Sequence, residues 1–201
     1  MKWLACLALA GVVSAVSAET VRVCYNYGCL AEAEAHFDEA RMTQLAAWLG
    51  AAQDAADERA RLSLAVGWML GWAGEQTPIA ADRGGNFADQ AAFGRMDCID
   101  HSTTTTRLLR LLEARGWLRF HRVAEPAQRV LYLVQVHFSA QIEERAVPPE
   151  GGGTLAAPER HVVDSWFRDN GQPAVVMRLE EWLAGNEDQL EAVAIAGRSP
   201  D

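Results

Sequence analysis

Residues 97–116 read Asp-Cys-Ile-Asp-His-Ser-Thr-Thr-Thr-Thr-Arg-Leu-Leu-Arg-Leu-Leu-Glu-Ala-Arg-Gly, and this stretch decides the fold. Leucine recurs at helical spacing in its second half, and Gly116 stands where a helix C-cap is expected. We therefore predict a helix from about Cys98 to Arg115. Its run of four threonines forms helix poorly because branching at Cβ restricts the side-chain rotamers. Tertiary packing must hold the helix there, and the helix begins with a cysteine.

Beyond Gly116 the apolar period changes from helical spacing to two, which indicates strands. We predict an antiparallel sheet, because the connections between the strands contain no helix. Glu125-Pro126-Ala127 is predicted to turn between the first two strands, and Asp169-Asn170-Gly171 is a strong hairpin signal between the last two. The predicted strands are residues 117–123, 129–139, 161–167 and 173–179.

The residues on either side of this core predict helices and loops. An alanine-rich segment, 31–49, is loosely helical, and a clearer amphipathic helix follows the acidic start at Asp54. Its Trp68 and Trp72 are interpreted as core residues. Residues 74–94 and 147–153 are predicted loops, and 180–196 is predicted to be helical. No composition shift divides residues 19–201, so we expect one α+β domain in which helices pack on an antiparallel sheet.

The N-terminus has the pattern of a secretory signal. Lys2 supplies the positive charge, residues 3–13 the apolar core, and Val16-Ser17-Ala18 the small-residue cleavage site. The alternative is a buried N-terminal helix, but polar residues at helical spacing are missing. The apolar run is too short to span a membrane. We therefore expect residues 1–18 to be a signal peptide and the mature protein to be exported, in the periplasm.

Composition and charge exclude several other classes of protein. Half of the residues are hydrophobic and 22% are charged, as in an ordinary globular protein. The 18 Lys and Arg residues against 27 Asp and Glu residues give a net charge of −9. This is the wrong sign for gripping phosphate backbones, so we expect no nucleic-acid partner.

Because thiols tend to pair in an oxidising compartment, export leads us to expect a disulfide among the cysteines. Cys6 is removed with the signal peptide, which leaves an odd number, namely Cys24, Cys29 and Cys98. Cys24 and Cys29 flank Tyr-Asn-Tyr-Gly, which favours a tight turn, so we predict a disulfide between them. A metal site beginning at this pair is the alternative, but no second cysteine pair follows. Cys98 is then the free thiol.

Three residues of this chain could perform chemistry together. A cysteine at a helix N-terminus becomes nucleophilic when a neighbouring histidine can accept and donate protons. His137 lies on the more polar face of its predicted strand, and Asp164 is an acid within an otherwise apolar one, where it needs a partner. If the three residues act together, the partner of Asp164 is His137. In the alternative, Asp164 pairs with Arg168 or Arg178.

A zinc site drawn from the strand histidines and this acid is a further alternative. No pair among its ligands has the i, i+4 spacing of a helical zinc motif, which argues against it. We therefore expect no metal and no cofactor. The four candidate ligands are His121, His137, His161 and Asp164.

The motifs appear in the order of a known family. Asp-Cys-x-Asp at a helix start, then Val-His-Phe, then Val-Val-Asp-Ser-Trp resembles the transglutaminase-like, papain-related cysteine proteinases of bacteria, with motifs close to Gly-Asp-Cys-Glu-Asp, His-Ala-Val and Leu-Asp-Asn. The resemblance covers residues 62–182. It implies a transglutaminase-like, papain-like core with Cys98 as nucleophile, His137 as general base and acid, and Asp164 as the carboxylate that orients the histidine.

The sequence departs from that family at Met96, Ile99 and Ser165, where the family has Gly, an acid and Asn. Acids around the cysteine bind calcium in some exported relatives, and the isoleucine removes one of them, which argues against a calcium site. The resemblance implies an exported cysteine-dependent hydrolase, either a peptidase or an amide or acyl transferase, acting on a protein or peptide.

The alternative is a catalytically silent module of the same fold that binds a protein or peptide. Asp97 and Asp100 favour it, because one carboxylate at ~7 Å disfavours a thiolate by about 2 kcal/mol at an effective dielectric constant of about 20.

Overall fold

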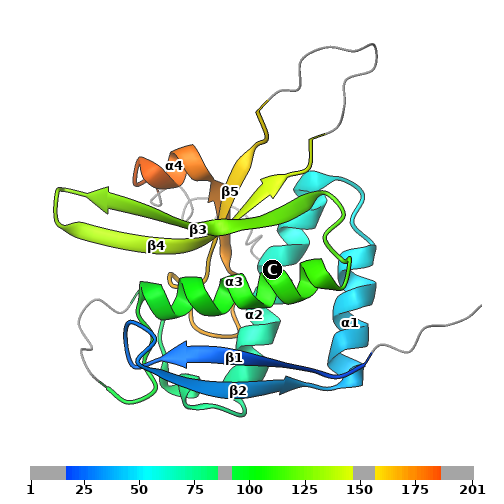
Figure 1. Ribbon diagram of the computed structural model, residues 1–201, viewed down its shortest axis with the longest axis horizontal. Coiled ribbons are helices and arrows are strands. Elements are labelled where there is room, and N and C mark those ends of the chain that lie inside the picture. Colours follow the sequence, from blue (N-terminus) through cyan, green and yellow to red (C-terminus); the bar gives the residue numbers. More distant parts are fainter. Residues whose placement is uncertain (1–16, 86–91, 147–156, 187–201) are drawn as a thin grey trace, which may run out of the picture.

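The computed structural model describes residues 17–85, 92–146 and 157–186 (Figure 1). These residues form helices and two antiparallel sheets, so the α+β class is confirmed. The predicted signal peptide lies outside them except for its last two residues. No helix among the described residues is both long and apolar enough to cross a membrane. In chain order the elements are β1 (Glu19–Tyr25), β2 (Ala31–Phe37), α1 (Glu39–Gly50), α2 (Ala55–Gly74), the 3₁₀ helix η1 (Pro78–Ala81), α3 (Cys98–Ala114), β3 (His121–Leu131), β4 (Gln135–Glu144), β5 (Arg160–Asp164), β6 (Val175–Arg178) and α4 (Leu179–Leu183).

Helix α3 runs through the centre of the molecule and confirms the predicted helix (Figure 1). Asp97 caps it through a capping box with Asp100, and Gly116 follows its end with φ +71°. The threonines are held by packing and hydrogen bonds, as their low helix propensity requires. Thr104 Oγ1 accepts from the backbone N–H of Cys24 at 2.9 Å, and Thr105 Oγ1 bonds Ser165 Oγ at 2.8 Å.

The first part of the segment predicted as loosely helical is a strand. Residues 31–37, Ala-Glu-Ala-Glu-Ala-His-Phe, alternate between small or apolar side chains and polar ones, and they pair antiparallel with β1 as strand β2. The helical prediction was wrong here because alanine favours helix by propensity, whereas the period of two decides the structure. Asp38 then caps α1, and Asp54 caps α2, which confirms the second helix. Trp68 and Trp72 are partly buried against the main core.

The second sheet has the order β3-β4-β5-β6, and every neighbouring pair is antiparallel. The predicted strand 129–139 is wrong, because it contains the β3–β4 hairpin turn. Tyr132 and Leu133 have φ values of +50° and +66°, and Val134 N–H closes the turn on Leu131 O at 3.2 Å. The turn was missed because these apolar residues lack the glycine, asparagine or aspartate that such a turn usually contains.

The turn predicted at Glu125-Pro126-Ala127 is also wrong. These residues lie inside β3, where the register with β4 shifts between Ala124 and Ala127. Proline cannot donate a ladder hydrogen bond, and a strand irregularity of this kind accommodates it. The Asp-Asn-Gly segment does lie in the connection between β5 and β6, where Gln172 N–H donates to Asp169 O at 2.9 Å.

The apolar residues of the described chain form two clusters. The larger joins α1, α2 and α3 to both sheets and includes Leu112, Ala140 and Val163. The smaller joins β5 and β6 to α4 and includes Val162 and Trp182. Neighbouring residues of β5 belong to different clusters, as side-chain alternation requires. Figure 1 shows α3 and α4 on opposite sides of this sheet. Of the other predicted loops and helices, residues 86–91, 147–156 and 187–201 lie outside the described part.

Candidate functional site

Cys98 is the first residue of α3, and the capping box of Asp97 and Asp100 fixes the backbone on either side of it. The Asp97 side chain accepts the backbone N–H groups of Ile99 and Asp100 at 3.0 and 2.9 Å, and the N–H of His101 donates to Asp97 O. The cap does not use the Cys98 N–H. Cys98 is partly buried and is the free cysteine of the described residues.

His137 and Asp164 lie on the adjacent strands β4 and β5. Ala140 pairs with Val163, so Ser139 and Asp164 come next in register, and His137 is two residues further along on the same face. His137 Nε2 is 2.8 Å from Asp164 Oδ2, and both residues are buried. The arginine alternative is not formed by Arg178, which pairs with Glu159 at 3.3 Å.

The Cys98 side chain lies close enough to the His137 imidazole to affect the pKa of that ring. Burial acts to lower the pKa of His137, but the Asp164 carboxylate and the Cys98 thiol outweigh it and raise that pKa to about 9. The imidazole is therefore positively charged at neutral pH. The structure thus brings together a sulfur atom, an imidazolium and a carboxylate from three different elements.

Three aromatic rings surround the imidazole. Trp166, Phe167 and Trp182 have ring centroids 5.0, 5.4 and 5.6 Å from that of His137. Trp182, in α4, also donates its indole N–H to Asp164 Oδ2 at 3.0 Å, and Trp166 N–H donates to Asp164 Oδ1 at 3.1 Å. The carboxylate is thereby fixed by three donors in a setting that excludes water.

Trp182 is itself held from β3. The Arg129 guanidinium lies over its ring at 4.5 Å from the centroid and donates to its backbone oxygen. Sequence reasoning missed both residues in this role. The tryptophan lies in α4, which begins directly after β6, and its place at the end of the region resembling the family was the one available signal.

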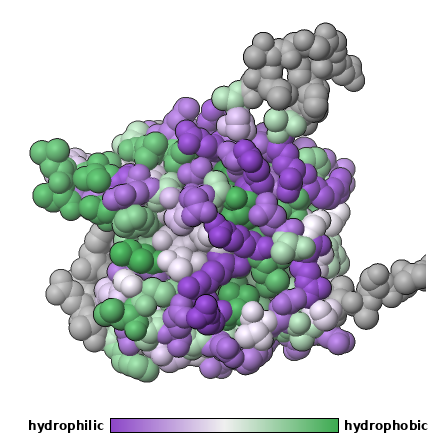
Figure 2. Space-filling model, viewed as in Figure 1, coloured by the Kyte–Doolittle hydropathy of each residue, from purple (hydrophilic) through white to green (hydrophobic). Residues whose placement is uncertain are grey.

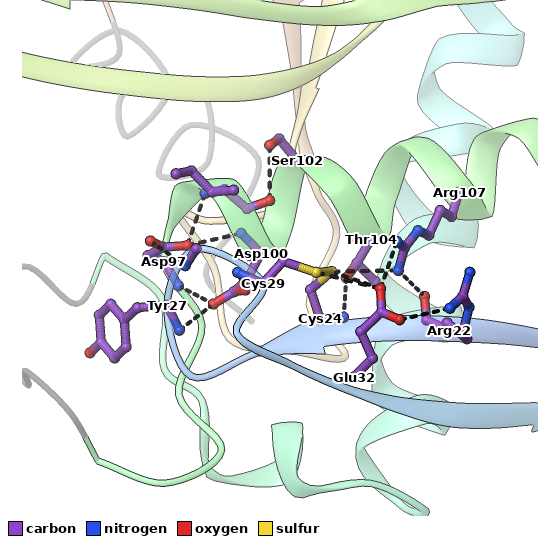
Figure 3. The surroundings of a disulfide bond; sticks show 12 residues. Arg22, Cys24, Tyr27, Cys29, Glu32, Asp97, Asp100, Ser102, Thr104 and Arg107 are labelled. Atoms are coloured by element: carbon purple, nitrogen blue, oxygen red, sulfur yellow. Dashed lines mark hydrogen bonds and ion pairs between the residues drawn. A yellow bond between two sulfur atoms is a disulfide. The ribbon is translucent and has the colours of Figure 1, made fainter.

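A turn from the first hairpin lies against the start of α3 (Figure 3). Asn26, Tyr27, Gly28 and Cys29 all have φ between +57° and +66°. Asp100 accepts the N–H groups of Tyr27 and Cys29 at 2.8 and 2.6 Å, and Asp97 accepts that of Gly28 at 2.9 Å. The two acids beside Cys98 therefore hold this left-handed turn.

These hydrogen bonds reduce the repulsion between the two carboxylates and a thiolate at Cys98. Each carboxylate accepts three backbone N–H groups, counting the capping bonds and the bond from Asp97 N–H to Asp100 at 3.1 Å. Burial and the negative charge of Asp97 raise the pKa of Asp100 to about 6, although the N–H donors oppose this.

The predicted disulfide joins Cys24 and Cys29 across this turn, which confirms it (Figure 3). Glu32 lies beside it, and Arg107 of α3 pairs with that carboxylate at 2.7 Å. The side-chain bond from Arg107 lowers the pKa of Glu32. The first hairpin is thus joined to α3 at two points: its turn contacts Asp97 and Asp100, and Glu32 of β2 contacts Arg107.

A buried network supports the residues next to Cys98 and Asp164. His101 Nε2 is 2.9 Å from Asp82 Oδ2, and its Nδ1 is 2.9 Å from Ser165 Oγ. Asp82 also accepts the N–H of Met96 at 2.9 Å. The network has the composition of a serine triad, but Ser165 is only 4% exposed and also bonds Thr105. Its role is structural, because substrate cannot reach the hydroxyl.

The zinc site considered from the sequence is not formed by its four residues together. His121 and His161 lie near Glu144, at the other end of β4 from His137. Glu144 is seven positions along the strand from His137, about 23 Å at a rise of ~3.3 Å per residue.

Comparison with known proteins adds no assignment. No family model, no curated protein and no solved structure matches the chain. The chemistry of the site therefore rests on its own geometry.

Proposed function

We propose that the protein is an exported cysteine-dependent hydrolase, or an acyl transferase of the same chemistry, that acts on amide bonds of a protein or peptide. The observation that carries this proposal is the series Cys98, His137 and Asp164. The carboxylate is hydrogen-bonded to the imidazole, and the side chain of Cys98, at a helix N-terminus, raises the pKa of that imidazole. That arrangement is the one expected of a transglutaminase-like, papain-like core. The Cys24–Cys29 disulfide supports export, because such bonds persist in oxidising compartments.

In this mechanism the Cys98 thiolate attacks the carbonyl carbon, and the C=O electron pair moves onto the oxygen. The Cys98 N–H, which the cap leaves unused, is directed at that oxyanion. His137 gives its proton to the leaving amine as the C–N bond breaks, which leaves a thioester on Cys98. His137 then takes a proton from water, or from an acceptor amine, as that nucleophile attacks the thioester. The C–S bond breaks, the acyl product leaves, and the Cys98 thiolate is restored beside the imidazolium.

The roles of the remaining residues follow from their contacts. Asp164 stabilises the imidazolium and fixes the ring through its bond to Nε2, which leaves Nδ1 to exchange protons in the reaction. Trp182 and Trp166 are positioning residues, because they hold Asp164 and exclude water from its bond to His137. Hydrolysis and transfer differ only in which nucleophile attacks the thioester.

The competing function is a catalytically silent module that binds a protein or peptide. The observation that favours it is the pair of carboxylates, Asp97 and Asp100, on either side of Cys98. They repel a thiolate, although their N–H donors reduce the effect.

Alkylation across pH distinguishes the two functions. With the disulfide intact, iodoacetamide is expected to modify Cys98 at pH 5 to 6 at least tenfold faster than a free thiol, whose pKa of about 8.5 leaves little thiolate there. His137→Ala should remove this excess, whereas His36→Ala, at an exposed histidine of β2, should not. A free-thiol rate profile in the wild type, unaffected by His137→Ala, contradicts the enzyme and supports the silent module.

A further inference from the structure

A second cluster of ionisable side chains lies at the end of the larger sheet farthest from His137. His121 begins β3, Glu144 ends β4, and His161 is in β5. The register pairs His121 with Glu144, and places His161 opposite Ile142. Each of the three side chains offers one nitrogen or oxygen atom, and these atoms lie within 4.8 Å of one another. His121 Nε2 is 4.0 Å from Glu144 Oε1.

The position of His121 is fixed from behind. Its Nδ1 is 2.8 Å from Glu58 Oε1, a fully buried carboxylate of α2. Glu58 also accepts the backbone N–H groups of residues 119, 120 and 121, and its pKa stays below the ordinary value despite burial. Nδ1 therefore faces the Glu58 carboxylate, and Nε2 is the nitrogen that faces Arg59 and Glu144. A carboxylate behind a histidine in this way is the usual support of a metal-bound imidazole.

His161 is the second observation that points to a ligand. It is 4% exposed, and its Nδ1 is buried with no hydrogen-bond partner in the described part of the chain. An imidazole nitrogen left without a partner in the interior is costly, and buried polar groups normally have one. The ring stands perpendicular to that of His121, with their centroids 6.4 Å apart.

Arg59 contacts two of these groups, His121 and Glu144. Its Nη1 lies 3.3 Å from His121 Nε2 and contacts Glu144 Oε1. Its side chain is 19% exposed, so the guanidinium can turn to solvent. The cationic group therefore stands where a metal ion would be, and holds the anionic ligand in place.

We propose that His121, Glu144 and His161 bind a divalent transition-metal ion of the zinc class, and that Arg59 occupies the site in its absence. Two imidazoles and one carboxylate are a zinc-type ligand set, and water would complete the tetrahedron. The bound ion would join β3, β4 and β5 at one point. It lies outside the proposed catalytic residues, so its presence does not depend on the proposed function.

Zinc titration by calorimetry tests this proposal, with Co²⁺ absorption as a probe of tetrahedral geometry. All proteins carry Cys98→Ser, so that the metal cannot bind at the thiol and His137. We expect one Zn²⁺ per chain. Arg59→Ala should bind it at least tenfold more tightly, because the competing cation is gone. Glu144→Gln, which keeps the size of the side chain, should weaken binding at least tenfold, as should His161→Ala, whereas His36→Ala should not change it.

Each other outcome overturns the proposal. If Cys98→Ser protein with Arg59 intact binds no zinc, Arg59 is a permanent member of an ion-pair network. If zinc binds but is indifferent to Glu144→Gln, the metal is held elsewhere. The far-ultraviolet circular dichroism of each variant shows that it is folded, and Glu144→Gln decides the question if His161→Ala does not fold.

Discussion

At the scale of single residues, the hydrogen-bond donors around Asp164 determine its role. Its Oδ2 accepts from both His137 and Trp182, and its Oδ1 accepts from Trp166. These three donors fix the carboxylate beside the imidazole, whose charged form it stabilises. The high pKa of His137 is thus a property of three elements brought together, and no single motif contains it.

Replacing Asp164 tests this dependence directly. Asp164→Asn keeps the shape but removes the negative charge, so the pKa of His137 should fall from about 9 toward or below its ordinary value of 6.5. Turnover, where a substrate is found, should fall by about 10² to 10⁴. Histidine-ring NMR signals followed across pH measure the shift. The matched control is Glu180→Gln at an exposed position of α4. A pKa of His137 unchanged in Asp164→Asn would contradict the arrangement.

At the scale of elements, the β3–β4 hairpin extends beyond the body of the molecule with an apolar tip (Figures 1 and 2). Leu133 is 94% exposed, whereas Leu112 of α3 is fully buried. Leu133→Ala should therefore change the free energy of unfolding by less than about 0.5 kcal/mol, and Leu112→Ala should lower it by about 2 to 5 kcal/mol. Urea denaturation measures both. Equal effects would mean that the tip packs on the protein in solution.

The turn at Cys24–Cys29 gives a second prediction at this scale. The disulfide closes a short loop, which stabilises the fold by about 2 kcal/mol in the chain-entropy model. The double variant Cys24→Ser/Cys29→Ser should lose about that much. It should also change the alkylation rate of Cys98, because the turn donates to both flanking acids. The matched control is Ser17→Ala. Loss of stability with an unchanged rate would mean that the turn does not influence the thiol.

The elements also show what the sequence could and could not predict. Helix α3 was predictable because its leucine spacing, its cap and Gly116 are all local signals. Strand β2 was not, because alanine propensity opposed its period of two. The hairpin turn at Tyr132 and Leu133 has no turn residues, so the strand prediction ran through it. The period of two still held from Gln135 onward, which is why His137 and Asp164 lie on one face as expected.

At the scale of the whole molecule, the sheet separates two kinds of site. One end of β4 brings His137 to the start of α3, and the other brings Glu144 to the start of α2. Contacts such as Trp182 with Asp164, or Glu58 with His121, join residues far apart in sequence. No local pattern could predict them, because they depend on how helices pack on both faces of the sheet.

The charged groups of both sites should together shape how stability depends on pH. The pKa of His137 is raised to about 9, so its contribution is complete below pH 6.5 and is lost as the pH rises from 6.5 to 9. The pKa of His161 is lowered to about 4, chiefly by burial and then by Arg59 and His121, so stability should fall as the pH drops from 6.5 to 4.

The pKa of Asp100 is raised to about 6, so its ionisation above pH 4 destabilises the folded state. Stability from this group therefore increases as the pH drops from 6 to 4, which is opposite to the effect of His161. The two effects largely cancel, which leaves a plateau between about pH 4.5 and 6.5. Below it the lowered pKa of Glu58 removes stability on acidification. Above it the decline belongs to His137 and should reach a few kcal/mol by pH 9, since one pKa unit corresponds to about 1.4 kcal/mol. Urea unfolding at half-unit steps of pH, with EDTA present, measures the curve. His137→Gln should flatten its alkaline part, and an alkaline decline that persists in this variant would mean that the imidazolium does not stabilise the fold.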